Sequence, residues 1–254
     1  MNSVYNVVNC NEDLRSELNS QESRHKESFI VAQPPLLWRT VHCLLCIIGG
    51  TTFLLGSIQY LPYFSHEAKG AYLFTIGSFC FFLADLLEFV SYHQLPSGIV
   101  GSNKKVGWFA RSEDFLNSLM MTTGSLSYFI GCVYFVPQLH HTDVGDILFI
   151  PGSVLLFIAE VWRIYRSGST LFNAQTERIE RCEFHLHHIT NTPVFCADMS
   201  LCLGAVAFLV GSILFLPNLD LTTVDTRRAA MVFILGSALF LQSAICLFYA
   251  YFVA

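Results

Sequence analysis

Two pairs of ionisable residues occupy matching places in long apolar segments of this 254-residue chain, and they are the residues best suited to chemistry. Asp85 and Glu88 form the first pair, and Glu160 and Arg163 form the second. Ionisable side chains inside a membrane helix are costly to bury, so they are functional candidates by default. This candidate charge cluster could carry protons or cations, or it could pair Arg163 with the acids and anchor the helix ends at the interface. The corresponding positions of a third apolar segment are uncharged, so we expect ion pairing and no symmetric pore.

Histidine and cysteine are concentrated at residues 182–188, a run with one cysteine and three histidines. Such residues could bind a transition metal, but no second pair stands at zinc spacing. We therefore favour a solvated segment beside the membrane and predict no metal site. The surrounding residues 170–188 could form a short helix on the membrane surface. Cys43 and Cys46 have the spacing of a redox pair, but they lie in an apolar segment and are interpreted as small core residues.

Other chemistry leaves no recognisable trace in the sequence. We find no nucleophile elbow, phosphate-binding loop, dinucleotide fingerprint or metalloprotease motif. The sequence therefore predicts no catalytic residue and no cofactor, and we expect that the protein is not an enzyme. The net charge of −5 gives no sign of nucleic-acid binding.

The elements that position these residues are apolar segments long enough to cross a membrane. Hydrophobic residues make up 53% of the chain and charged residues 13%, against about 25% charged residues in a soluble domain. A membrane-spanning helix needs about 20 apolar residues. Six runs have about this length: residues 41–61, 71–90, 115–136, 147–165, 195–216 and 229–253. The sequence thus predicts an all-α, polytopic membrane protein with six transmembrane helices.

One short motif, aromatic-x-x-Gly-Ser, recurs once in every apolar run. It begins at Phe53, Phe74, Phe149, Phe208 and Phe233, and a sixth copy beginning at Tyr128 has cysteine in place of serine. The first helix of each pair is followed by a proline and a short loop, which forces the two helices into an antiparallel hairpin. The chain is therefore predicted to be three repeated hairpins.

Glycines at fixed spacing mark the predicted contact faces of these helices. A glycine notch lets a neighbouring helix approach closely, which is how membrane helices associate. The serine beside it can bond to its own helix or to a partner. Packing is the interpretation that we favour, and a ligand groove lined by serines is the alternative. The predicted helix-packing residues are Gly49, Gly56, Gly77, Gly124, Gly131, Gly152, Gly204, Gly211 and Gly236.

The distribution of basic residues predicts the orientation in the membrane. Only Lys69, Arg227 and Arg228 of the 14 Lys and Arg residues fall in the loops within hairpins. Cytoplasmic segments carry the excess of Lys and Arg, so both termini and both linkers between hairpins are predicted to be cytoplasmic. The membrane in which the protein resides is not predicted.

The hairpin of two short helices, each with this motif and joined by a Leu-Pro-like turn, resembles the YrhK-like family of small membrane domains. Residues 49–62 and 74–84 and their counterparts in the two later units carry the resemblance. The family implies a membrane location and a hairpin unit, and it implies no activity. Members resemble a single hairpin, so three copies suggest that units which would otherwise oligomerise have been fused.

These observations divide the chain into a polar tail, three hairpins and two linkers. We expect a non-enzymatic structural or interaction module in a membrane, with a small-solute or ion transporter as the alternative. Its expected partners are the lipid bilayer and either further copies of itself or other membrane proteins, and not nucleic acid. The predicted divisions are a disordered tail (1–33), hairpin one (34–93), a cytoplasmic linker (94–113), hairpin two (114–166), a second cytoplasmic linker (167–192) and hairpin three (193–254).

Overall fold

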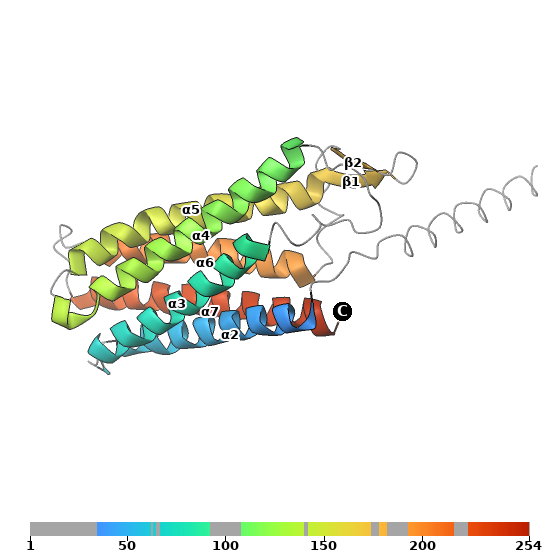
Figure 1. Cartoon of the computed structure of the whole chain (residues 1–254). Coiled ribbons are helices and arrows are strands. Elements are labelled where there is room, and N and C mark those ends of the chain that lie inside the picture. Colours follow the sequence, from blue (N-terminus) through green and yellow to red (C-terminus); the bar gives the residue numbers. More distant parts are fainter. Residues whose placement is uncertain are drawn as a thin grey trace, which may run out of the picture.

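Six long helices make up the structure, a computed structural model that describes residues 35–61, 63–64, 67–91, 108–139, 142–173, 178–181, 193–215 and 223–253. They form three antiparallel hairpins, as Figure 1 shows. The helices are α2 (Leu36–Gln59), α3 (Glu67–Ser91), α4 (Trp108–Tyr134), α5 (Thr142–Ser169), α6 (Pro193–Phe215) and α7 (Thr223–Phe252). A 3-10 helix, η1 (Pro137–Leu139), follows α4, and two strands, β1 (Thr170–Asn173) and β2 (Arg178–Arg181), follow α5.

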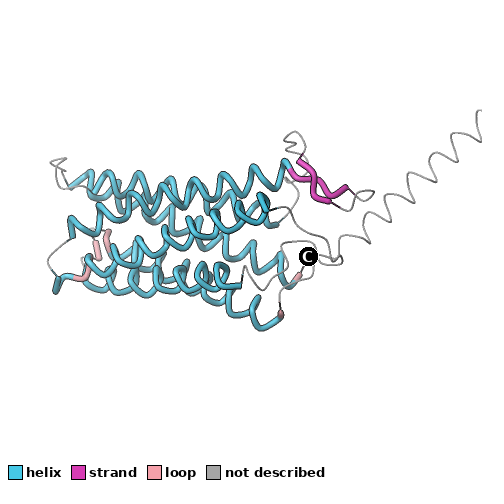
Figure 2. Tube along the Cα trace, turned by 45° about the horizontal axis from the view of Figure 1, so that its top comes forward, coloured by secondary structure: helices cyan, strands magenta, loops and turns pink. Residues whose placement is uncertain are grey.

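The three hairpins close into a ring. Each helix packs against the helices before and after it in the sequence, and α7 packs against α2 (Figure 2). The beginning of α2 and the end of α7 meet where the Arg39 guanidinium donates to the carbonyl oxygen of Tyr251 at 2.8 Å. The first hairpin is tied to itself at the same end, because the Trp38 indole donates to the Ser91 hydroxyl at 2.8 Å. The first and the last hairpin are therefore joined to each other, and the ring is closed.

Aromatic side chains fill the centre of this ring. The aromatic residue that opens the motif in α2, α4 and α6 is buried in each case: Phe53, Tyr128 and Phe208. The ring centroid of Phe208 lies 5.5 Å from that of Phe53 and 5.7 Å from that of Tyr128. Aromatic pairs at these distances attract one another beyond the area that they bury. Equivalent residues of three hairpins thus form one shared core.

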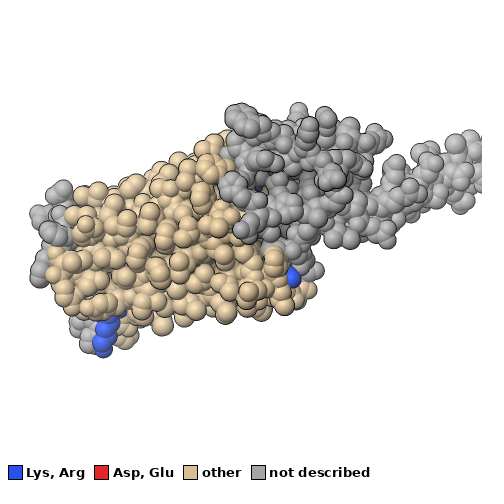
Figure 3. Space-filling model, viewed as in Figure 1, with Lys and Arg blue, Asp and Glu red and all other residues tan. Residues whose placement is uncertain are grey.

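The outer surface is apolar, as a membrane protein requires. Five helices, all except α4, are long and apolar enough to cross a membrane. In Figure 3, the described part of one face has blue patches near its ends and neither acidic nor basic residues between them. The all-α, polytopic prediction is confirmed. For α4 the crossing stays a prediction, because this helix also contains polar residues such as Glu113 and Asn117.

Two segments differ from the sequence-based expectation. The predicted linkers 94–113 and 167–192 are helical at one end, because α4 begins at Trp108 and α5 ends at Ser169. Apolar character stops at the edge of the hydrocarbon, whereas a helix can continue into the polar interface. The surface helix considered for residues 170–188 is wrong over its first part, where β1 pairs antiparallel with β2. Thr, Phe and Ile in these strands favour extended structure. The predicted tail (1–33) and the cysteine–histidine run (182–188) lie outside the described residues.

Candidate functional site: a buried charge cluster

Glycines place the two helices of each hairpin in close contact. All nine predicted packing glycines are buried. A methyl group added at Gly77 of α3 would lie 2.9 Å from the carbonyl oxygen of Gly49 in α2, and one added at Gly49 would lie 3.1 Å from that of Gly77. Gly124 and Gly152 face each other in the same way, at 3.1 and 3.0 Å. No side chain fits in these seams without displacing backbone.

Two further glycines belong to the same seams and were not predicted. Gly70 of α3 faces the carbonyl oxygen of Gly56, and Gly145 of α5 faces that of Gly131. Each stands seven residues before the motif glycine of its helix, which is also the spacing between the two predicted glycines of α2, α4 and α6. In α7 this position holds a buried alanine, Ala229. The signal was therefore present in the sequence, but it is complete in only two of the three hairpins.

The motif serines already have hydrogen-bond partners, either in another hairpin or in their own. Ser57 and Ser237 join α2 to α7 through hydroxyl oxygens 2.8 Å apart. Ser57, Ser153 and Ser212 also donate to carbonyl oxygens four residues earlier, at 2.8 to 2.9 Å. These buried hydroxyls already form hydrogen bonds within the protein. The structure therefore gives no support to the alternative, a ligand groove lined by serines.

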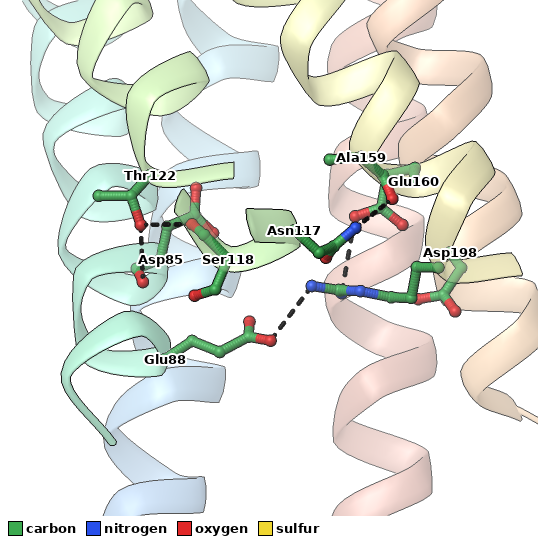
Figure 4. Close-up of polar contacts among 9 residues, drawn as sticks. Asp85, Glu88, Asn117, Ser118, Thr122, Ala159, Glu160 and Asp198 are labelled. Atoms are coloured by element: carbon green, nitrogen blue, oxygen red, sulfur yellow. Dashed lines mark hydrogen bonds and ion pairs between the residues drawn. The ribbon is translucent and has the colours of Figure 1, made fainter. Parts of the chain in front are cut away.

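Arg163 is the centre of the candidate charge cluster. Its guanidinium lies 3.1 Å from Glu88, 3.6 Å from Glu160 and 3.8 Å from Asp198, measured between the nearest nitrogen and carboxylate oxygen. These acids come from α3, α5 and α6, so one cation joins all three hairpins (Figure 4). Three of the four predicted members thus meet directly, at the end of the bundle that holds the C-terminus.

Asp85 lies beside this group and not within it. Among the described ion pairs none includes Asp85. Figure 4 places it on α3 beside Ser118 and Thr122 of α4, and the Thr122 hydroxyl donates to its backbone carbonyl at 3.3 Å. Asp85 therefore faces the α3–α4 seam, whereas Glu88, one turn later, reaches Arg163.

Asp198 was missed from the sequence. It is the single charged residue of α6, and it lies near the beginning of that helix. Its side chain is only 8% exposed and it faces Arg163. A lone acid in an apolar helix is itself a signal, because burying it requires a partner.

Glu160 is the most deeply buried member of the cluster. It has no exposed surface, and neither carboxylate oxygen accepts a hydrogen bond from the described residues. Nearby, the Asn117 amide of α4 donates to the carbonyl oxygen of Ala159 at 2.7 Å. The Asn117 side chain thus fixes the backbone beside Glu160 without neutralising its charge.

A small apolar cavity lies at the opposite end of the bundle, near the loops within hairpins. Each of the six helices or the turn after it contributes one aromatic residue to its lining: Tyr60, Phe74, Phe135, Phe149, Phe215 and Phe233. In the described part of the chain, no group of three or more His, Cys, Asp or Glu residues could hold a metal ion. The charge cluster is therefore the stronger candidate for a functional site.

Comparison with known proteins identifies the repeated hairpin. A family model described as YrhK-like protein matches residues 37–92 and 194–249. These two segments are YrhK-like units. The two matches cover α2–α3 and α6–α7, whereas the middle hairpin α4–α5 lies outside them. No curated protein matches the chain, and no solved structure does.

Proposed function

We propose that this protein is a non-enzymatic structural or interaction module of a membrane, in which three hairpins replace an oligomer of single hairpins. The middle hairpin is a diverged third unit. The support for this third unit is geometric. Gly124 and Gly152 make the same reciprocal backbone contact as Gly49 and Gly77 of the first hairpin, which the family model matches.

The observation that carries the proposal is the aromatic core on the axis of the ring. Phe53, Tyr128 and Phe208 meet where a channel through a ring of helices would have to pass. Tyr128 is held there by its hydroxyl, which lies 2.6 Å from that of Ser153. A solid core suits a scaffold whose outer face meets lipid, further copies of itself or other membrane proteins.

The proposed orientation has both termini in the cytoplasm. Lys69, Arg227 and Arg228 are the basic residues assigned to the hairpin-loop end, and the remaining Lys and Arg residues belong to the other end. The positive-inside rule then favours a cytoplasmic location for the charge cluster end. The loops within hairpins face the opposite side.

A transporter of a small solute or ion is the second candidate. It is favoured by one observation, the buried carboxylate of Glu160 beside partly exposed Glu88 and Arg163. A transport role requires that these groups change protonation or partner during a cycle.

Flux through reconstituted vesicles separates the two candidates. The purified chain would be placed in phospholipid vesicles that contain a pH-sensitive dye, with potassium or sodium gradients in separate experiments. We expect no proton or cation flux above that of empty vesicles. A flux from the parent protein that disappears in Asp85→Asn or Glu160→Gln would reverse the ranking.

A further inference from the structure

We propose that the charge cluster is a proton-binding site and that Glu160 holds the proton in the folded protein. The inference goes beyond the role of a membrane module and holds whether or not the protein transports anything. It follows from the balance of charges around Arg163 and from the surroundings of Glu160.

The cluster contains more negative charge than its cation can neutralise. Arg163 lies within 4 Å of three carboxyl groups, those of Glu88, Glu160 and Asp198. One guanidinium carries one positive charge, so two negative charges would remain beside Arg163 if all three acids were ionised. Arg166, which also acts on Glu88 and Asp198, could offset only one of them. Asp85, on the turn of α3 before Glu88, would add a third. Removing an unpaired carboxylate from water is strongly unfavourable, and such groups bind a proton instead.

Glu160 gains the least from its neighbours while it is charged. The distance of 3.6 Å to the Arg163 nitrogen is too long for a hydrogen bond. Glu88, in contrast, accepts a hydrogen bond from Arg163 at 3.1 Å, and its side chain is 37% exposed against 0% for Glu160. Asp198 lies 3.8 Å from Arg163, but 8% of its side chain is exposed and neither of its oxygens is a buried atom without a partner. Glu160 is therefore the carboxylate that a proton stabilises most.

Two other buried polar atoms next to the cluster also lack a partner among the described residues. They are the Ser118 hydroxyl of α4 and the Nδ1 atom of His42 in α2. Figure 4 shows Ser118 between Asp85 and Glu88, on the side of α4 that faces the cluster. Unpartnered polar atoms are uncommon in a packed interior, so they mark this end of the bundle as a polar site.

The proton can reach Glu160 from the end of the bundle. Exposure of the side chains falls from 37% at Glu88 through 22% at Arg163 to zero at Glu160. The ionisable groups that act on Glu160 are Arg163 on its own helix, Asp198 and Cys202 on α6, and Asp85 and Glu88 on α3, while His42 on α2 acts on Glu88. Acids predominate among them, which favours protonation of the most buried one.

Thermal unfolding of the full chain in detergent tests the proposal. The folded protein would retain a proton that unfolding releases near neutral pH, so stability should fall as pH rises, because the unfolded chain binds fewer protons. Between about pH 6 and about pH 8 the midpoint should fall by about 3 to 5 °C per pH unit. Glu160→Gln should fold and should remove most of this slope, because the amide is neutral at every pH.

Glu88→Gln is the matched control, since it removes a carboxyl group of the same cluster that is partly exposed and hydrogen-bonded. Its midpoint should still fall as pH rises, but over a lower pH range than in the parent, because it removes one of the negative charges that favour the proton on Glu160 while leaving Glu160 itself in place. A parent midpoint independent of pH, or a Glu160→Gln slope equal to that of the parent, would overturn the proposal. A midpoint that depends on sodium, with choline as the replacement at fixed pH, and not on pH would also overturn it and would indicate a metal cation.

Infrared spectroscopy of the parent protein keeps the proposal testable if Glu160→Gln does not fold. A protonated carboxyl group has a C=O stretching band separate from those of carboxylates and amides. We expect this band at about pH 7, where an isolated Glu is ionised, and its loss at higher pH. A spectrum with no such band at about pH 6 would exclude a buried protonated acid.

Discussion

Ser57 and Ser237, 180 residues apart in the sequence, have hydroxyl oxygens 2.8 Å apart in the seam where the last helix meets the first. Ser57 donates its own proton to the carbonyl oxygen of Phe53 at 2.9 Å, so Ser237 supplies the proton of the bond between the two serines. Both side chains are fully buried. Two copies of the repeated motif thus meet in one contact, one from the first helix of the ring and one from the last.

Removing either hydroxyl should destabilise the protein, and the two effects should not be additive. A double-mutant cycle of Ser57→Ala and Ser237→Ala should give a coupling free energy of about 0.6 kcal/mol, the average for hydrogen bonds between membrane helices, and no more than about 1.7 kcal/mol. Unfolding in a denaturing detergent would measure it. Ser127→Ala is the control partner, because Ser127 bonds only to its own helix, at Thr123, and should show no coupling to Ser57. Additive effects of Ser57 and Ser237 would show that the seam is not held by this bond.

Gly77→Ala should be more harmful than its size suggests. The added methyl group would lie 2.9 Å from the carbonyl oxygen of Gly49 and 2.6 Å from the Thr52 hydroxyl, so the hairpin must open. The cost should be about 1 to 3 kcal/mol in free energy of unfolding, as for overpacking elsewhere. Ile76→Leu, at the neighbouring exposed position, should be nearly neutral. Equal stability of the two variants would contradict the close backbone contact.

Much of this fold could be predicted because membrane helices are long, apolar and joined by short loops. The six helices and their pairing into hairpins follow from these features alone. The closure of α7 onto α2 could not be predicted, because the contacts that decide it, such as Ser57 with Ser237, involve a motif present in every helix. A repeated motif identifies the faces that pack, but it does not say which copy meets which.

The charge cluster was predictable in part for a similar reason. Glu160 and Arg163 stand three residues apart in one helix, and their contact with Glu88 follows once neighbouring hairpins are aligned. Asp198 carries no such local partner, so only the folded structure connects it to Arg163. Asp85 was grouped with Glu88 by sequence spacing, yet the helix turns it toward another seam.

Arg163→Gln should be among the most destabilising single changes in the chain. It leaves Glu88, Glu160 and Asp198 without their shared cation, and losing one partner of a buried ion pair costs about 3 to 5 kcal/mol. The charge exchange Glu160→Arg with Arg163→Glu should not restore stability, because a carboxylate at position 163 would face Glu88 and Asp198. Thermal unfolding would compare the variants. A stable charge-exchanged protein would show that only the local pair matters.

The proposed orientation predicts which ends of the bundle are accessible from outside the cell or organelle. An epitope tag inserted next to Tyr63, in the loop between α2 and α3, should be labelled by antibody in intact membranes. A tag after Val253 should be labelled only after the membrane is permeabilised. Tyr63 is 82% exposed, so an insertion beside it should not disturb the packing of the helices. Labelling of the C-terminal tag in intact membranes would invert the orientation.

Phe208→Ala distinguishes a core from a gate at the centre of the ring. Phe208 is fully buried, and its ring lies within 5.7 Å of Phe53, Tyr128 and Phe240. As a core residue it should cost about 3 to 5 kcal/mol when truncated, because the cavity cannot fully collapse. Phe208→Leu should cost less, since it keeps more of the volume.

If the aromatic core only fills space, both variants should remain as impermeable to protons and potassium in vesicles as the parent. If it closes a pore, Phe208→Ala should conduct while Phe208→Leu stays nearly closed. We expect the loss of stability without the gain of flux, and a conducting Phe208→Ala protein would assign the aromatic core to a channel.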